Sequence, residues 1–177
     1  HTKATERNIA ILSGLSARPI IHLRNLYDCI VSLRDHFDSA EYPRMSVVHM
    51  GRDYKMLNEK QNLDFLVDLA TPWYINFYVS WYEAERRGEV DILWTTYEEL
   101  LESTNQLLER ILKWYGLEKY TPDIDSAIRV VSEKGRRNRY NKGVKGRGEL
   151  MLSDSQKERI RNMTTYYPNV DFEKLGL

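Results

Sequence analysis

An arginine and a serine follow a short apolar run in a pattern that could hold a phosphate group. Residues 19–23 (PIIHL) are typical of a buried strand, and Arg24 comes directly after them. A helix that begins just past Arg24 would offer free backbone N–H groups and the positive end of its dipole to an anion. Arg24 would add a bidentate guanidinium, and Ser32 a hydroxyl about two turns into the helix. This junction therefore predicts an anion site.

The same residues also have a purely structural interpretation. Arg24 could pair with Asp28, four positions on, and Ser32 could be an ordinary serine at a helix interface. Strand-to-helix junctions are common, so local physics alone leaves both interpretations open.

A second concentration of charge lies late in the chain. Seven basic residues occupy fourteen positions without one carboxylate: Lys134, Arg136, Arg137, Arg139, Lys142, Lys145 and Arg147. Glycines punctuate the same stretch: Gly135, Gly143, Gly146 and Gly148. This composition predicts a basic loop over residues 134–149. Taken alone, such a run indicates a solvated surface or a nucleic-acid patch.

Helices and strands must position these residues. Four helices are expected in the first half, over residues 4–15, 27–37, 59–70 and 72–88. Asn25 is a plausible N-cap for the second helix, and Pro72 suits the first turn of the fourth. Residues 38–58 predict a mostly irregular segment, and residues 90–95 a second buried strand.

Capping boxes mark two helix starts in the second half, Thr96 with Glu99 and Ser153 with Gln156. The first should open one continuous helix that ends at Gly116, and the second a helix to about residue 164. Another helix is expected over residues 122–133. This order of strands and helices predicts a layered α/β architecture in which residues 1–177 form a single domain.

Length and charge limit the classes of function. The chain has 177 residues, 42% of them hydrophobic, which fits one compact domain. Its 26 basic and 26 acidic residues balance, so we expect neither nucleic acid nor a membrane as a partner. No apolar run approaches the roughly 20 residues of a membrane span. A single cysteine, Cys29, excludes an internal disulfide and fits a reducing compartment, so we expect a cytoplasmic protein.

With these residues in view, the chain resembles sulfotransferases that use 3′-phosphoadenosine 5′-phosphosulfate (PAPS). In that family a strand is followed by Arg-Asn-Pro-x-Asp and then a serine, and here Arg24-Asn25-Leu26-Tyr27-Asp28 precedes Ser32. The resemblance implies that Arg24 and Ser32 bind the 3′-phosphate. Leu26 stands where the family has proline, which should alter the turn only modestly because the helix start is still capped.

Later segments resemble the family in the same order. Residues 81–84 and 90–100 are similar to its Trp-containing helix, strand and Tyr-Glu-Asp-Leu motif, which implies that Tyr97 contacts the adenine. Without the family, Tyr97 would be an aromatic residue near a helix cap. Ser132 resembles a family serine or threonine beside the nucleotide.

The basic stretch is similar to the family's Lys-Gly-x-x-Gly loop, which closes over the 3′-phosphate. Lys142 and Gly143 align with that motif. Asn141 stands where an arginine is usual, so Arg139 would supply the missing charge. Arg147-Gly148 replaces the family's Asp-Trp.

The resemblance also gives His1 a role. The family has a Lys-Thr-His segment roughly two dozen residues before the phosphate-binding arginine, and its histidine is the general base. His1 precedes Arg24 by 23 positions. An imidazole with a pKa near 6.5 can accept a proton from a hydroxyl while the oxygen attacks sulfur in line. A histidine at the first position could equally belong to a tag.

The family has a P-loop NTPase-like three-layer fold, in which many helices flank a parallel sheet. Its opening strand and Lys-Ser-Gly-Thr phosphosulfate loop have no counterpart among these residues, so we expect a fragment of a longer enzyme. The implied activity is transfer of the sulfuryl group from PAPS to a hydroxyl or amine of a small molecule or glycan, without a metal. The alternative is a non-catalytic module of the same fold that binds a nucleotide or docks through its basic loop. A kinase is disfavoured, because the sequence has no Walker loop.

Overall fold

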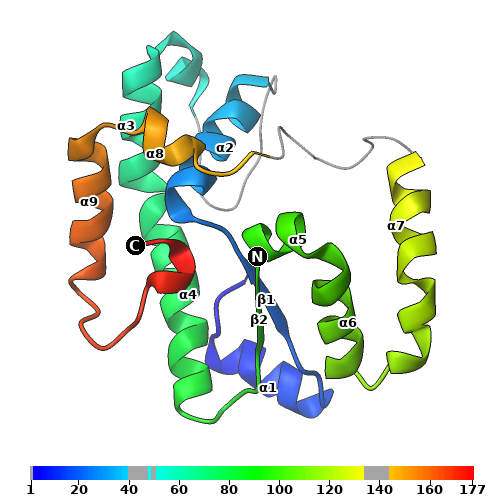
Figure 1. The fold of residues 1–177 in the computed structure, drawn as a ribbon. Helices are drawn as coiled ribbons and strands as arrows, with labels where there is room; N and C mark the ends of the chain where they lie inside the picture. Colours follow the sequence, from blue (N-terminus) through cyan, green and yellow to red (C-terminus); the bar gives the residue numbers. More distant parts are fainter. Residues whose placement is uncertain (1, 40–47, 49–50, 134–143) are drawn as a thin grey trace.

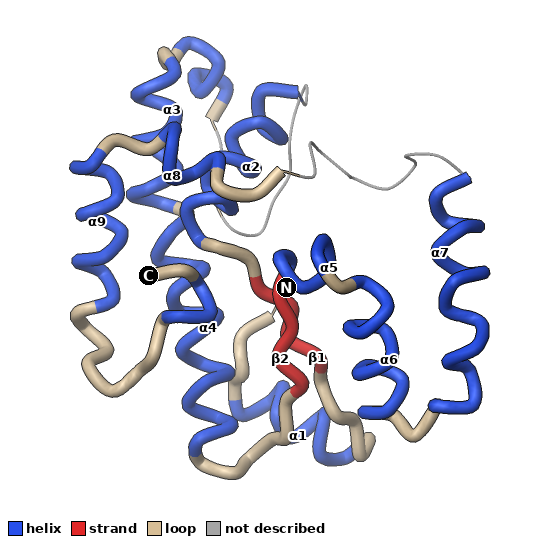
Figure 2. The backbone as a smooth tube through the Cα atoms, viewed as in Figure 1, coloured by secondary structure: helices blue, strands red, loops and turns tan. Residues whose placement is uncertain are grey.

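Two parallel strands lie at the centre of the molecule (Figure 2). The computed structural model describes residues 2–39, 48, 51–133 and 144–177. Among these, β1 (Ile20–Leu23) pairs with β2 (Leu93–Thr96), with Ile20 opposite Leu93 and Leu23 opposite Thr96. Because of this register, both strands end at the same level. The residues that follow them, Arg24 and Tyr97, therefore leave the sheet at one common edge.

Two groups of helices flank the strands (Figure 1). The first group contains α2 (Leu26–Ser39), α3 (Glu59–Leu69), α4 (Thr71–Arg86), α8 (Arg147–Met151) and α9 (Asp154–Thr164). The second contains α5 (Tyr97–Glu102), α6 (Thr104–Trp114) and α7 (Ile124–Glu133). Helix α1 (Glu6–Gly14) lies at the end of the strand pair where β1 begins (Figure 1). Three short 3₁₀ turns complete the described elements: η1 (Arg52–Met56), η2 (Glu118–Asp123) and η3 (Glu173–Leu175). The expected α/β class with a parallel sheet is confirmed.

An apolar core joins β1 to the first group of helices. Ile21 and Leu23 are buried while His22 between them is exposed, so the strand buries one face. Fully buried side chains from three helices belong to the same core cluster as that face: Ile30 and Phe37 of α2, Leu66 of α3, and Ile75 and Tyr78 of α4. Within the described ranges, no helix has both the length and the apolar character needed to cross a bilayer.

Side-chain caps set the helix starts as the sequence predicts. Asn25 Oδ1 accepts a hydrogen bond from the backbone N–H of Asp28 at 3.2 Å, so Asn25 caps α2. Both expected capping boxes form, at the starts of α5 and α9. These caps are local, which is why the sequence could predict them.

Three expected boundaries are wrong. The helix expected to run unbroken to Gly116 is interrupted at Ser103, whose φ of −145° and ψ of 47° are not helical. Thr104 Oγ1 donates to the carbonyl of Leu100 at 2.5 Å, a side-chain bond that competes with helical bonding. Strand β2 begins at Leu93 rather than at residue 90. Residues 147–149, expected in the basic loop, instead begin α8.

The core position of Leu66 gives a stability prediction. Leu66 is 0% exposed, and Leu69 on the same helix is 51% exposed. Leu66→Ala should lower the free energy of unfolding by about 2–5 kcal/mol, because it removes buried methyl groups and leaves a cavity. Leu69→Ala is the matched control and should change that energy by less than about 0.5 kcal/mol. Urea unfolding followed by circular dichroism measures both, and equal losses would contradict the assigned core.

Candidate functional site

Arg24 and Tyr97 meet at the edge where the two strands end. The guanidinium carbon of Arg24 lies 4.4 Å from the centroid of the Tyr97 ring, a cation–π contact. The contact follows from the parallel register, which brings the first residues after β1 and β2 to one place. The structure thus brings together two of the residues expected to bind the nucleotide.

Among the described residues, the Arg24 guanidinium is only partly hydrogen-bonded. Its Nη2 donates to the carbonyl of Val144 at 3.1 Å. The same atom lies 3.8 Å from Asp28 Oδ2, which is too long for a direct hydrogen bond. Its Nε is buried and has no partner within the described part of the chain. The pairing of Arg24 with Asp28 is therefore a long ion pair, and the arginine keeps a donor for an anion.

Asp28 is buried and is bonded to the end of the basic stretch. Its side chain accepts the backbone N–H of Gly146 at 2.7 Å through Oδ2 and that of Gly148 at 2.6 Å through Oδ1. Hydrogen bonds to a carboxylate are among the stronger ones in proteins. The sequence suggested Asp28 only as a partner for Arg24. No local pattern indicated its actual role, because the glycines that it binds lie 118 and 120 positions later in the chain.

The backbone at Gly146 and Gly148 explains why these residues are glycine. Gly146 has a φ of 78°, in the left-handed region that favours glycine. A Cβ atom on Gly148 would lie 2.2 Å from the carbonyl carbon of Tyr27 and 2.5 Å from the nitrogen of Asp28. The start of α8 therefore packs with its bare backbone against the first turn of α2.

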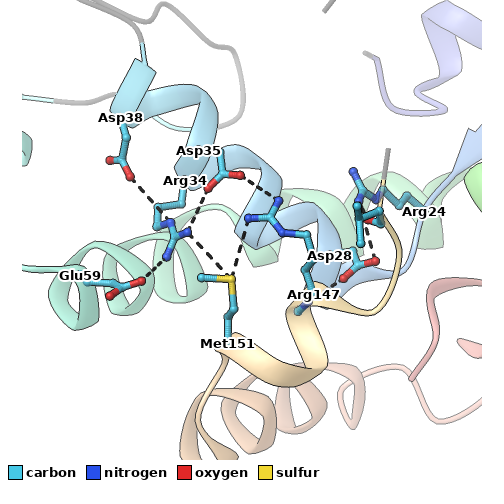
Figure 3. A network of polar contacts seen from close by, with 10 residues as sticks. Arg24, Asp28, Arg34, Asp35, Asp38, Glu59, Arg147 and Met151 are labelled. Carbon is cyan, nitrogen blue, oxygen red and sulfur yellow. Dashed lines mark hydrogen bonds and ion pairs between the residues drawn. The ribbon is translucent and has the colours of Figure 1, made fainter. Parts of the chain in front are cut away.

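The flank of α2 that carries Asp28 continues through Ser32 to Asp35, since residues three and four apart share a helix face. Asp35 Oδ2 lies 2.8 Å from Arg147 Nη1. Figure 3 shows how this network continues through Arg34, which also pairs with Glu59 at 2.6 Å. Ser32 is half-buried. By its spacing, Ser32 lies on the flank to which residues 144–148 are bound, close in sequence to both anchoring carboxylates.

Other expected site residues lie elsewhere or are not described. Ser132 is exposed on α7, where its Oγ donates to the carbonyl of Ile128 at 2.8 Å. Figure 1 shows α7 beyond α6, on the far side of the strands from α2. His1, Arg139, Lys142 and Gly143 lie outside the described residues.

A cleft of about 580 Å³ opens beside the start of α2. Its lining includes three carboxylates and two ammonium groups, from Asp28, Glu98, Glu173, Lys145 and Lys174. The cleft is therefore not strongly cationic. Arg24 does not line it, and the better place for an anion is the guanidinium of Arg24 over Tyr97.

Two titratable side chains lie near the strand ends. Burial raises the pKa of the Cys29 thiol to about 12 and outweighs the opposing effect of Arg24, so Cys29 is not a reactive thiolate at neutral pH. His22 as a whole is exposed, but its imidazole is partly buried, and this partial burial lowers the pKa of His22 against the raising effect of Glu98 and Glu99. His22 Nδ1 lies 2.9 Å from Thr95 Oγ1. Across the described ranges, no group of three or more His, Cys, Asp or Glu side chains could hold a metal ion.

Comparison with solved structures identifies the fold. The crystal structure of mouse sulfotransferase SULT7A1 complexed with PAP matches 93% of this chain, with a TM-score of 0.65 and 15% sequence identity. The chain has a sulfotransferase-like fold. The match covers 65% of the mouse chain. No protein-family model matches the sequence, and a search of curated proteins finds no match. The likeness therefore establishes the fold, and any activity must be argued from the site.

The lowered pKa of His22 predicts a pH dependence. The folded-state pKa lies below the value of about 6.5 expected when the chain is unfolded, so the unfolded state binds more protons between the two values. The contribution of neutral His22 to the free energy of unfolding should be fully present above about pH 6.5. It should be lost as the pH falls from there through the folded-state pKa. NMR titration of the His22 ring should give a midpoint below about 6.5. His22→Gln should lose less stability on acidification than the wild type, and a midpoint above the ordinary value would contradict the effect of burial.

Proposed function

We propose that the chain is the nucleotide-binding part of a PAPS-dependent sulfotransferase and that Arg24 binds the 3′-phosphate. The observation that carries this proposal is the Arg24 guanidinium, which stacks on Tyr97 and keeps a buried Nε–H without a partner in the described structure. Phosphate matches such a site, because it accepts bidentate hydrogen bonds from a planar guanidinium. The α2 dipole begins beside Arg24 and adds to the attraction.

Support also comes from the structural neighbour, a sulfotransferase complexed with PAP. In our proposal, Tyr97 contacts the adenine and Ser32 adds a hydroxyl to the 3′-phosphate. Arg139, Lys142 and Gly143 close over that phosphate, whereas Ser132 has no part in the proposed site because α7 lies on the far side of the strands from α2. In this proposal the other residues bind and orient PAPS, and none of them exchanges a proton with it during the reaction.

The proposed reaction transfers a sulfuryl group in the cytoplasm to a hydroxyl or amine of a small molecule or glycan. The acceptor atom attacks sulfur in line, the bond from sulfur to the bridging phosphate oxygen breaks, and adenosine 3′,5′-bisphosphate (PAP) leaves. His1 accepts the proton of the acceptor, which a neutral imidazole can do near pH 7. Cationic groups and N–H donors stabilise the charge on the departing phosphate.

Arg24→Ala tests the binding proposal. Loss of charge-assisted bonds to phosphate should weaken PAP binding by about 30- to 100-fold, as measured by isothermal titration calorimetry. Arg18→Ala is the matched control. Arg18 also stacks on an aromatic ring, with its guanidinium carbon 3.5 Å from the centroid of Trp114, but it precedes β1 at the opposite end of the strand. The Arg18 variant should keep its PAP affinity within about twofold, and equal losses in the two variants would refute the assignment.

A transfer assay separates the enzyme from a non-catalytic binding module. The full-length protein that contains these residues should transfer ³⁵S-labelled sulfate from PAPS to at least one member of a panel of phenols, amines and oligosaccharides. His1→Ala should lower the rate by about 10²- to 10⁴-fold and leave PAP affinity within about twofold, because a general base acts on the chemical step. PAP binding without any transfer would favour the non-catalytic module.

A further inference from the structure

The two oxygens of Asp28 are committed to the backbone of the opposite segment and not to Arg24. The N–H groups of Gly146 and Gly148 lie at 2.7 Å and 2.6 Å from these oxygens, whereas Arg24 Nη2 lies at 3.8 Å. Asp28 is 2% exposed, so its orientation is fixed. A carboxylate bonded in this way does not take up the hydrogen-bond donors of the neighbouring guanidinium.

The same bonds determine where Val144 lies. Val144 is two residues before Gly146, and its carbonyl accepts from Arg24 Nη2 at 3.1 Å. Holding Gly146 and Gly148 on α2 therefore also holds the Val144 carbonyl on one edge of the guanidinium. With Tyr97 beneath the guanidinium plane and Val144 at Nη2, the buried Nε is left without a partner among the described residues.

We propose that Asp28 is a positioning residue for the 3′-phosphate site: through Gly146 and Gly148 it orients Arg24 so that its uncommitted donors face the phosphate. This inference rests on the proposed function, because it assigns Asp28 to the same nucleotide site. Asp28 is expected to favour the binding of an anion although its own charge is negative. Asp28 carries a negative charge beside an anion site, so charge alone would make it an obstacle to binding.

Asp28→Asn distinguishes positioning from charge. The variant has nearly the same shape, but its amide NH₂ must face one of the two backbone N–H donors, so one hydrogen bond is lost. If charge dominates, the variant should bind PAP more tightly. If Asp28 positions Arg24, the variant should bind PAP at least about tenfold more weakly, which corresponds to roughly 1.4 kcal/mol.

The experiment measures the affinity of PAP and of adenosine 5′-monophosphate, which lacks the 3′-phosphate, for the wild type, Asp28→Asn and Asp38→Asn. Asp38 is a matched control, since it lies on the same helix but pairs with Arg34 of that helix, at 3.7 Å, rather than with the glycine backbone. We expect Asp28→Asn to weaken PAP alone and to leave the monophosphate within about twofold. Asp38→Asn should leave both ligands within about twofold.

Each outcome decides between the proposals. Unchanged or tighter PAP binding by Asp28→Asn overturns the inference and leaves the proposed function standing. An equal loss for both ligands also overturns it, because Asp28 would then act on the whole fold. A wild type that binds neither nucleotide overturns the proposed function and the inference with it.

Should Asp28→Asn fail to fold, the wild type still gives an answer. The amide resonances of Gly146 and Gly148 in a ¹H–¹⁵N NMR spectrum should shift when PAP is added and stay unchanged with the monophosphate. If the chain binds PAP and these amide resonances do not shift, the proposed role of Asp28 is overturned.

Discussion

The bonds from two glycine N–H groups to the buried carboxylate of Asp28 are the contact on which the site depends. They join the first turn of α2 to residues that lie 118 and 120 positions later in the chain. A buried carboxylate is unfavourable unless its oxygens are hydrogen-bonded, so these two donors also make it possible for Asp28 to lie inside the protein. The same two hydrogen bonds therefore hold the 144–148 segment on α2 and satisfy the buried carboxylate in the first turn of that helix.

The parallel strand pair supplies the other half of the site. Parallel strands need a crossover, and here residues 24–92 provide it, with α2, α3 and α4 all on one side of the sheet. Binding sites in open α/β sheets lie beyond the carboxyl ends of the strands. The level ends of β1 and β2 explain why Arg24 and Tyr97, each the first residue after its strand, lie in contact.

The sequence predicted what depends on neighbouring residues. Asn25, Thr96 and Ser153 cap their helices through bonds to residues three positions on, and such bonds can be inferred from spacing alone. The break at Ser103 could not be inferred, because the apolar face of residues 100–115 continues across it. The contacts of Asp28 with Gly146 and Gly148 were missed for a different reason: no local pattern reveals a partner more than a hundred residues away. The meeting of Arg24 with Tyr97 was expected only through the family resemblance.

Gly148 sets a limit on how this sequence can diverge. Because a Cβ atom at this position would overlap the backbone of Tyr27, the segment cannot accept even alanine without moving away from α2. The sulfotransferases that the chain resembles have Asp-Trp in place of Arg147-Gly148. A tryptophan could not occupy position 148 with the backbone of this segment where it lies here. Because the overlap is with backbone atoms of Tyr27 and Asp28, no side-chain substitution at those two positions could make room for a larger residue at position 148, and only a displacement of the segment could.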